Sequence, residues 1–181
     1  MQLSAFAVLL RAQNMLLNKH ITVIDEYSAA YRASYANDGN HDTTFFHSLS
    51  TNQPWASIDM GAGSTVRSVH YTNRLGCCEY RINPAVVTVG DNIDIKLNPQ
   101  CAGLVITDSG WYSCDPPLTG RYFGIWLQRT EYLQIQEIRA YPFKYLTNLA
   151  SSATEINALT NKSLNNLWKI MNPQDLAERV T

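Results

Sequence analysis

The residues best suited to bind a ligand lie between Asn73 and Arg81, in the segment Asn-Arg-Leu-Gly-Cys-Cys-Glu-Tyr-Arg. Arg74 and Arg81 each carry several N–H donors in a fixed planar fork and no acceptor. If they converge, they suit a ligand whose acceptors lie side by side, such as a diol, a carboxylate or a phosphate. The alternative is that both arginines are surface charges and the two cysteines are buried thiols. We favour the binding loop.

The four cysteines permit three pairings, of which we favour Cys77–Cys78 with Cys101–Cys114. Neighbouring Cα atoms lie about 3.8 Å apart, below the roughly 4.4–6.8 Å usual for bridged cysteines, so a Cys77–Cys78 bridge requires strain. It would stiffen the loop and present a flat apolar plate. Cys101 and Cys114 share one polar, turn-rich segment. Two bridges would imply an oxidising compartment, and no Cys-x2-Cys spacing supports zinc.

Composition and charge limit the class of protein. The chain has 181 residues, enough for one domain of about 130–150 residues with tails. Its 14 Lys and Arg against 15 Asp and Glu give a formal charge of -1, which does not favour binding to nucleic acid or membranes through bulk charge. No apolar run reaches the roughly 18 residues of a bilayer span. We expect a tail or weak signal-like segment at 1–13 and a domain at 14–142.

Short apolar runs separated by Gly, Pro, Asn and Asp favour an all-β sandwich over helices. Their regular spacing predicts a jelly roll, with turns at 61–63, 90–92, 116–117 and 119–120. In residues 143–181 the pattern predicts a linker and an amphipathic helix, or the start of a truncated repeat. The expected strands are 57–60, 66–71, 85–89, 104–107, 111–114, 121–127 and 133–141.

A second polar cluster lies at residues 35–47, which contain too many turn formers for a strand. Asp38 and Asn40 flank a glycine, an arrangement that can aim a carboxylate and a main-chain carbonyl at one hard cation. Glu137, on the last expected strand, could add a second carboxylate. A plain Asp-Gly turn is the alternative. The candidate ligands for calcium are Asp38, Asn40, Glu137, Tyr35 and Gln136.

In their order along the chain, these motifs resemble those of the F-type lectins, or fucolectins. Residues 73–81 are similar to the Asn-Arg-x-Asp-Cys-Cys-x-x-Arg loop that binds L-fucose in that family, with Gly76 in place of the aspartate. Residues 36–47 resemble a family motif that contributes to a structural calcium site. Ser50 and Gln136 stand where family members often have cysteines. Further similar pieces at 54–55, 58–61, 87–90, 98–101, 120–122 and 133–138 extend the resemblance over about residues 14–142.

The resemblance implies a calcium-stabilised jelly-roll lectin that binds terminal L-fucose or a related sugar. Arg74 and Arg81 would donate to the ring oxygen and adjacent hydroxyls. Either His47 or Asn52 would donate to another hydroxyl, and we prefer His47. Aromatic side chains would surround the methyl group of the sugar, and the cysteine plate would pack against its apolar face. The expected sugar-binding set is His47, Asn52, Arg74, Arg81, Cys77, Cys78, Phe45, Phe46 and Tyr27.

A single sugar makes few contacts, so useful avidity needs several sites in a homo-oligomer or a tandem array. The leading hypothesis is therefore a secreted or extracellular lectin for fucosylated glycans or glycoproteins, acting in cell adhesion or innate immunity. The alternative is an adhesion or structural discoidin-like domain whose glycan site has degenerated. An enzyme is not supported, because the sequence lacks paired acids, a Gly-x-Ser-x-Gly elbow and a phosphate loop.

Overall fold

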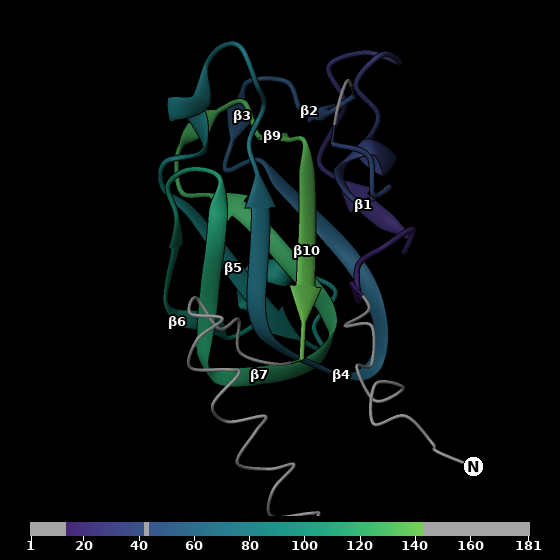
Figure 1. The fold of residues 1–181 in the computed structure, drawn as a ribbon, viewed down its shortest axis with the longest axis vertical. Coiled ribbons are helices and arrows are strands. Elements are labelled where there is room, and N and C mark those ends of the chain that lie inside the picture. The colour runs from purple at the N-terminus through teal and green to yellow at the C-terminus, as the bar shows by residue number, and fades with distance from the viewer. Residues whose placement is uncertain (1–13, 42–43, 143–181) are drawn as a thin grey trace, which may run out of the picture. The chain divides into compact units, whose positions relative to one another are not determined.

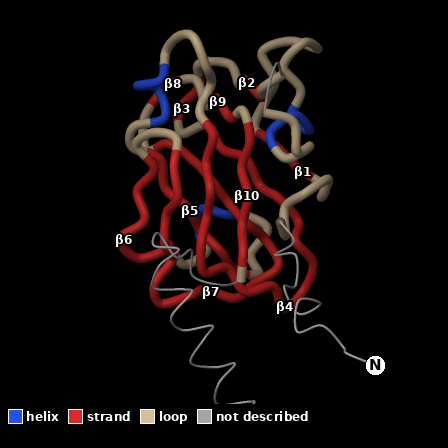
Figure 2. The backbone as a smooth tube through the Cα atoms, in the orientation of Figure 1, coloured by secondary structure: helices blue, strands red, loops and turns tan. Residues whose placement is uncertain are grey.

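Two long antiparallel strands, β4 (Trp55–Thr72) and β7 (Gly110–Leu127), form the framework of the fold (Figure 1). They pair along most of their length in this computed structural model, which describes residues 14–41 and 44–142. Both strands bend, so that one pair of strands serves both layers of a jelly-roll sandwich (Figure 2). The predicted fold class is confirmed.

The remaining strands pair with different halves of this framework. β1 (Ile21–Val23) pairs with the first half of β4, and β10 (Glu137–Tyr141) pairs with its second half. Beyond β7 the sheet continues through β5 (Ala85–Gly90) to β6 (Gln100–Ile106). The short elements are β2 (Phe46–His47) with β9 (Gln134–Ile135), β3 (Thr51–Asn52) with β8 (Thr130–Glu131), and the 3-10 helices η2 (Ala33–Ala36), η3 (Glu79–Ile82) and η4 (Ile95–Leu97).

The core consists of the inward side chains of these strands, and its large members include Tyr71, Phe46 and Phe123. Burying such residues is the main stabilising contribution to a sandwich of this size, at roughly 1.5–3 kcal/mol for each fully buried large apolar side chain. Phe46 was predicted to contact the sugar. That prediction is wrong, because Phe46 is fully buried in the core.

Two expected turns are bulges inside continuous strands. Gly61 and Gly63 adopt positive φ values of 88° and 72°, and the pairing of β4 with β7 shifts between Asp59 and Ser64. A second shift faces the Pro116-Pro117 segment of β7. A positive-φ glycine serves a bulge as well as a turn, and proline is tolerated at bulges because it cannot donate to the ladder. The expected strands 57–60 and 66–71 are therefore one strand, as are 111–114 and 121–127.

The predicted strand 133–141 is instead divided at Gln136. On one side of the break β9 pairs with β2, and on the other β10 pairs with β4. The Gln136 backbone N–H donates to the Thr72 carbonyl across the break at 3.1 Å, an ordinary hydrogen-bond distance. The interruption sends Gln134 and Glu137 to two different clusters of polar groups.

The cysteine pairing is correct for one bridge and wrong for the other. Cys101 of β6 and Cys114 of β7 form a disulfide across the sheet. Cys77 and Cys78 are free thiols, so the sulfur plate expected in the binding loop is absent. The short separation of adjacent Cα atoms disfavours that bridge. A hydrogen bond with the Cys78 thiol, together with burial, raises the pKa of Cys77.

The expected tail at 1–13 and the expected helix or repeat fragment at 143–181 lie outside the described residues. Within the part of the chain that the structure describes, no helix has the length and apolar character needed to cross a membrane.

Replacing Cys101 and Cys114 together with serine should destabilise the domain by about 2–4 kcal/mol, because the bridge constrains the unfolded chain over a sequence separation of 13. Urea denaturation without reductant measures the change. The matched control is Cys77→Ser with Cys78→Ser, which should leave stability nearly unchanged because these thiols are free. A control less stable than the wild type without reductant, but equal to it when both are fully reduced, would instead reveal a Cys77–Cys78 bridge.

Candidate ligand-binding site

Three nitrogen donors converge on the side chain of Gln134. With the amide oriented so that its oxygen faces these donors, Oε1 accepts from His47 Nε2 at 2.6 Å, Arg74 Nη1 at 3.0 Å and Arg81 Nη1 at 3.1 Å. The predicted convergence of the two arginines is therefore present. We call His47, Arg74 and Arg81 the donor cluster.

The sheet register explains why Gln134 lies at this point. His47 of β2 and Gln134 of β9 are directly opposed cross-strand partners. Opposed residues on antiparallel strands have side chains on the same face, with Cβ atoms about 4.5–5.5 Å apart. The two side chains are thus brought into contact by the backbone pairing itself.

Asn73 fixes the loop that supplies the arginines. Its side chain is almost completely buried, donates from Nδ2 to the Glu79 carbonyl at 2.8 Å, and accepts at Oδ1 from the Arg74 backbone N–H at 2.9 Å. Its own backbone N–H donates to Ser109 Oγ at 2.8 Å. These bonds tie both ends of the loop to one buried amide, and thereby set the directions in which Arg74 and Arg81 leave the backbone.

Aromatic rings support the charged groups. The Arg74 guanidinium carbon lies 4.7 Å from the Phe45 ring centre, and that of Arg81 lies 4.4 Å from the Tyr132 ring centre. Stacking on aromatic faces favours a cation and restricts its motion. Arg81 Nε is also 3.7 Å from a Glu131 carboxylate oxygen, and the Arg129 guanidinium donates to the Arg81 carbonyl at 2.6 Å.

His47 lies in a buried environment that disfavours its charged form. The side chain is 6% exposed, and the rings of Tyr27, Tyr31, Phe45 and Tyr132 lie around it. Burial lowers its pKa most, and the Arg74 and Arg81 charges lower it further, against the contact with the Ser48 carbonyl. The imidazole is therefore mainly neutral near pH 7.

The structure separates the predicted ligand-binding residues into two groups. Tyr27, 53% exposed, and Phe45 lie beside His47. Asn52, the alternative to His47, lies at an exposed position of β3 opposite Thr130, and His47 makes the contact with the cluster. The sequence analysis missed Gln134, Tyr31, Tyr132, Glu131 and Arg129.

The cluster presents donors and cations, which suits a ligand rich in oxygen acceptors. Its histidine contacts the Ser48 carbonyl and the Gln134 amide, so no general base with a nucleophile is assembled at this point. Apolar surface lies next to the arginines, since Leu75 and Tyr80 are both largely exposed. An amphipathic ligand with several hydroxyls and one apolar face fits this combination.

A second cluster of polar groups lies around Glu137, and the 38–40 turn, which carries the predicted calcium ligands Asp38 and Asn40, contacts it. Glu137 is fully buried, and its Oε2 accepts from the Gly39 backbone N–H at 3.1 Å. Asp38 Oδ1 accepts from the Asn40 backbone N–H at 2.8 Å, which closes the expected turn. The Gln136 amide N–H₂ donates to the His41 carbonyl. Tyr35 lies on η2, with its backbone N–H bonded to the Arg32 carbonyl at 3.1 Å.

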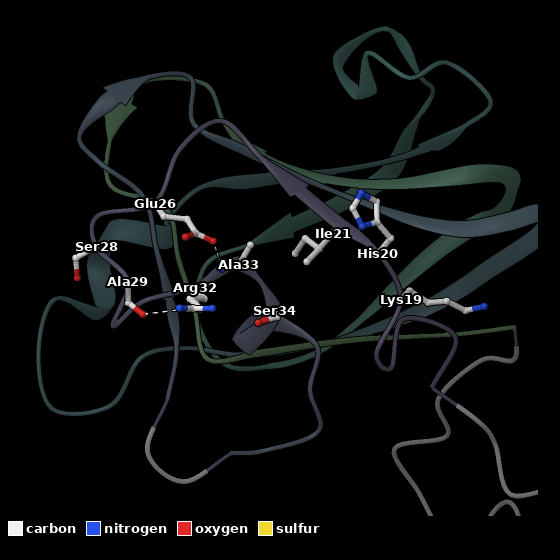
Figure 3. Close-up of a pocket in the computed structure, with 9 residues that line it drawn as sticks. All are labelled: Lys19, His20, Ile21, Glu26, Ser28, Ala29, Arg32, Ala33 and Ser34. Carbon is white, nitrogen blue, oxygen red and sulfur yellow. Dashed lines mark hydrogen bonds between the residues drawn. The ribbon is translucent and has the colours of Figure 1, made fainter.

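A cleft elsewhere on the domain contains none of the predicted ligand-binding residues. It is lined by residues 19–21 and by part of the segment 26–34 (Figure 3). Its Glu26 carboxylate accepts from the Ala33 backbone N–H at 2.7 Å, and Arg32 Nε donates to the Ala29 carbonyl at 3.3 Å. The Glu26 and Arg32 side chains thus hold the local chain together.

Comparison with known proteins identifies the class and then the family. Residues 35–125 match the family described as NedA-like, galactose-binding domain. Fucolectin-4 of Anguilla japonica is 34% identical over 122 residues, which cover 62% of this chain and 68% of the relative. Fucolectin of Anguilla anguilla is 32% identical over 123 residues, covering 62% and 78%. The chain belongs to the fucolectin family.

Solved structures agree with this assignment. A fucolectin from the serum of Morone saxatilis, the striped bass, superposes with a TM-score of 0.65 at 32% identity, over 71% of this chain and 47% of that chain. A fucose binding module of Streptococcus pneumoniae shares the fold, with a TM-score of 0.63 at 18% identity over 73% of this chain and 96% of that one. The chain spans 64% of the length of another relative, fucolectin-6 of Anguilla japonica, at 35% identity.

Asn73→Ala should destabilise the domain by about 1–3 kcal/mol, because it removes the bonds to Glu79 and Arg74 and leaves their partly buried backbone groups without these partners. Urea denaturation followed by circular dichroism measures the loss. Asn52→Ala, at an exposed position, is the matched control and should change stability little. Equal stability of the two variants would show that Asn73 does not brace the loop.

Proposed function

We propose that this domain is a non-enzymatic lectin that binds terminal L-fucose or a closely related sugar at the donor cluster. One observation carries the proposal: Arg74, Arg81 and His47 converge on a single oxygen, in the loop that resembles the fucose-binding loop of the fucolectins. The relatives named fucolectin and the modules named as fucose-binding support the choice of sugar.

In this proposal the arginines carry the recognition. Guanidinium N–H groups of Arg74 and Arg81 donate to the ring oxygen and to neighbouring hydroxyls, and charge-assisted hydrogen bonds of this kind are roughly twice as strong as neutral ones. His47 contacts a further hydroxyl through Nε2. Tyr27 and Phe45, which lie beside His47, supply the apolar contact for the methyl group of a 6-deoxy sugar.

We also propose that Glu137 and Asp38 hold a structural calcium ion together with main-chain oxygens near Asn40. The support is the state of Glu137: Oε1 is buried without a hydrogen-bond partner and lies 3.9 Å from Arg139 Nε. Burial raises the pKa of this carboxyl to about 7. A divalent cation would favour the charged form and satisfy the unpaired oxygen, so the chemistry of the residues fits the ion.

The described residues hold no group of three or more His, Cys, Asp and Glu side chains that could bind a metal ion. A calcium site here would accordingly depend on carbonyl oxygens, which this hard cation accepts readily. Calcium would cross-link the 38–40 turn to β10. Its contribution would be to stability and to the placement of neighbouring loops.

An extracellular location and an assembly of several sites complete the proposal. The Cys101–Cys114 disulfide is typical of an oxidising compartment. A single monosaccharide buries little surface and binds weakly, so a lectin gains useful affinity by presenting several sites to a multivalent glycan. Fucosylated glycans or glycoproteins are the partners we propose.

Arg74→Ala should weaken binding of L-fucose at least about tenfold, because a charged donor contributes about 1.5–3 kcal/mol per hydrogen bond. Arg74→Lys should also lose affinity, since an ammonium group cannot reproduce the planar fork. Isothermal titration calorimetry at millimolar sugar measures both.

The matched control is Arg67→Ala, an exposed arginine of β4, which should bind fucose as the wild type does. The melting temperatures of all three variants should remain close to that of the wild type. Wild-type affinity in Arg74→Lys, or no heat of binding with the wild-type protein, would contradict the proposed sugar site.

Removing calcium with EDTA should lower the melting temperature, and adding it back should restore it. At a calcium concentration of 100 times Kd, the ion would stabilise the fold by about 2.7 kcal/mol. Differential scanning calorimetry measures the effect, and Glu137→Gln should abolish it because the buried charge for the ion is lost.

Glu131→Gln, which changes a carboxylate outside the Glu137 cluster, should keep the full calcium response. Magnesium serves as the ion control, because it requires smaller and more regular coordination. A melting temperature that is the same in EDTA and in calcium would count against the site.

A further inference from the structure

We infer that the amide oxygen of Gln134 is an internal occupant of the donor cluster, in the position that a ligand oxygen must take, and that sugar binding requires its displacement. The inference rests on the proposed function, because it identifies the residue that limits the affinity of that same site. Gln134 is thereby assigned as an affinity-determining residue.

The position of Gln134 is the first part of the argument. Its Oε1 lies within 3.1 Å of one nitrogen on each of His47, Arg74 and Arg81, the three side chains that would recognise the sugar. The side chain is only 2% exposed, so it lies within the cluster and not beside it. Cross-strand pairing with His47 holds the backbone of Gln134 next to the donors, while the side chain retains its own rotatable bonds.

The protonation of His47 is the second part. Nδ1 lies 2.6 Å from the Ser48 carbonyl oxygen, and Nε2 lies 2.6 Å from Gln134 Oε1. Both oxygens are acceptors, but a neutral imidazole carries only one N–H. The burial and neighbouring charges described above favour the neutral form. One of the two short contacts then places a nitrogen lone pair against an oxygen lone pair.

Rotating the amide does not remove this conflict. Its N–H₂ group could donate to a neutral Nε2, but the same group would then face the N–H donors of Arg74 and Arg81. A hydroxyl does remove it, because one hydroxyl can donate to His47 Nε2 and accept from the guanidinium groups. A polyol is therefore a better partner for these groups than the glutamine, whereas an ionised carboxylate or phosphate, which only accepts, meets the same conflict.

Two substitutions test the displacement in opposite directions. Gln134→Ala removes the occupant and should raise the affinity for L-fucose at least about fivefold, because binding no longer competes with an internal contact. Gln134→Glu keeps the shape of the side chain but supplies a carboxylate, which the guanidinium groups should hold more strongly. Its affinity for fucose should fall at least about tenfold. Titration calorimetry measures both, with Gln128→Ala, an exposed glutamine, as the matched control.

A histidine titration by NMR provides a readout that does not depend on the sugar. Relative to the wild type, the pKa of His47 should fall in Gln134→Ala, because the Nε2–H of the protonated imidazole loses its acceptor. The pKa should rise in Gln134→Glu, because the substitution adds a negative charge. The Gln128→Ala control should leave this pKa unchanged. Equal melting temperatures of wild type and variants would show that the effects on binding are local.

Each outcome decides the inference. Unchanged or weaker fucose binding by Gln134→Ala, or wild-type binding by Gln134→Glu, would overturn it and make Gln134 a fixed support of the arginines, while the proposed function would stand. Stronger fucose binding by Gln134→Ala together with weaker binding by Gln134→Glu would support it. If no variant binds fucose, displacement by fucose and the proposed function both fail, and the pKa of His47 then shows whether the Gln134 contact itself exists.

Discussion

Like charges repel, and this repulsion is the constraint on which the donor cluster depends. Two guanidinium groups can lie close together only if an acceptor between them offsets their mutual repulsion and the loss of water. Gln134 supplies that acceptor, while Phe45 and Tyr132 lie under the two cations. The two aromatic rings keep the Arg74 and Arg81 side chains directed at one point before any ligand arrives, and in our account a sugar oxygen replaces Gln134 as the acceptor between them. Such preorganisation reduces the entropy lost on binding.

The scaffold contributes by bringing together segments that are far apart in the sequence. β2 and β9 bring His47 next to Gln134, and the 73–81 loop begins where β4 ends. The break at Gln136 then separates the neighbouring polar groups, so that Gln134 points to the donor cluster and Glu137 to the Gly39 turn. One short segment of backbone thus positions the central residue of each proposed site. A shift of one residue in its register would exchange the faces of these side chains.

The fold was largely predictable because alternating apolar runs and turn residues mark a β-sandwich directly. The bulges at Gly61 and near Pro116 were predicted as turns, because the same residue types occur at turns and at bulges. Only the pairing with a distant strand distinguishes the two. Within the site, the arginines were identified because guanidinium chemistry and an unusual motif single them out. Gln134 could not be identified in this way, because an amide within a strand carries no local sequence signal. Its role becomes visible only from its cross-strand pairing with His47.

The central claim is that the arginine pair recognises terminal fucose, and a glycan array tests it most directly. Labelled wild-type protein and Arg74→Ala would be applied at high density to glycans with terminal fucose and to the same glycans after fucosidase treatment. The account predicts a wild-type signal confined to the fucosylated glycans and lost in the variant. No signal on any fucosylated glycan, or an equal signal after fucosidase treatment, would contradict it and leave an adhesion domain without a fucose site as the better description.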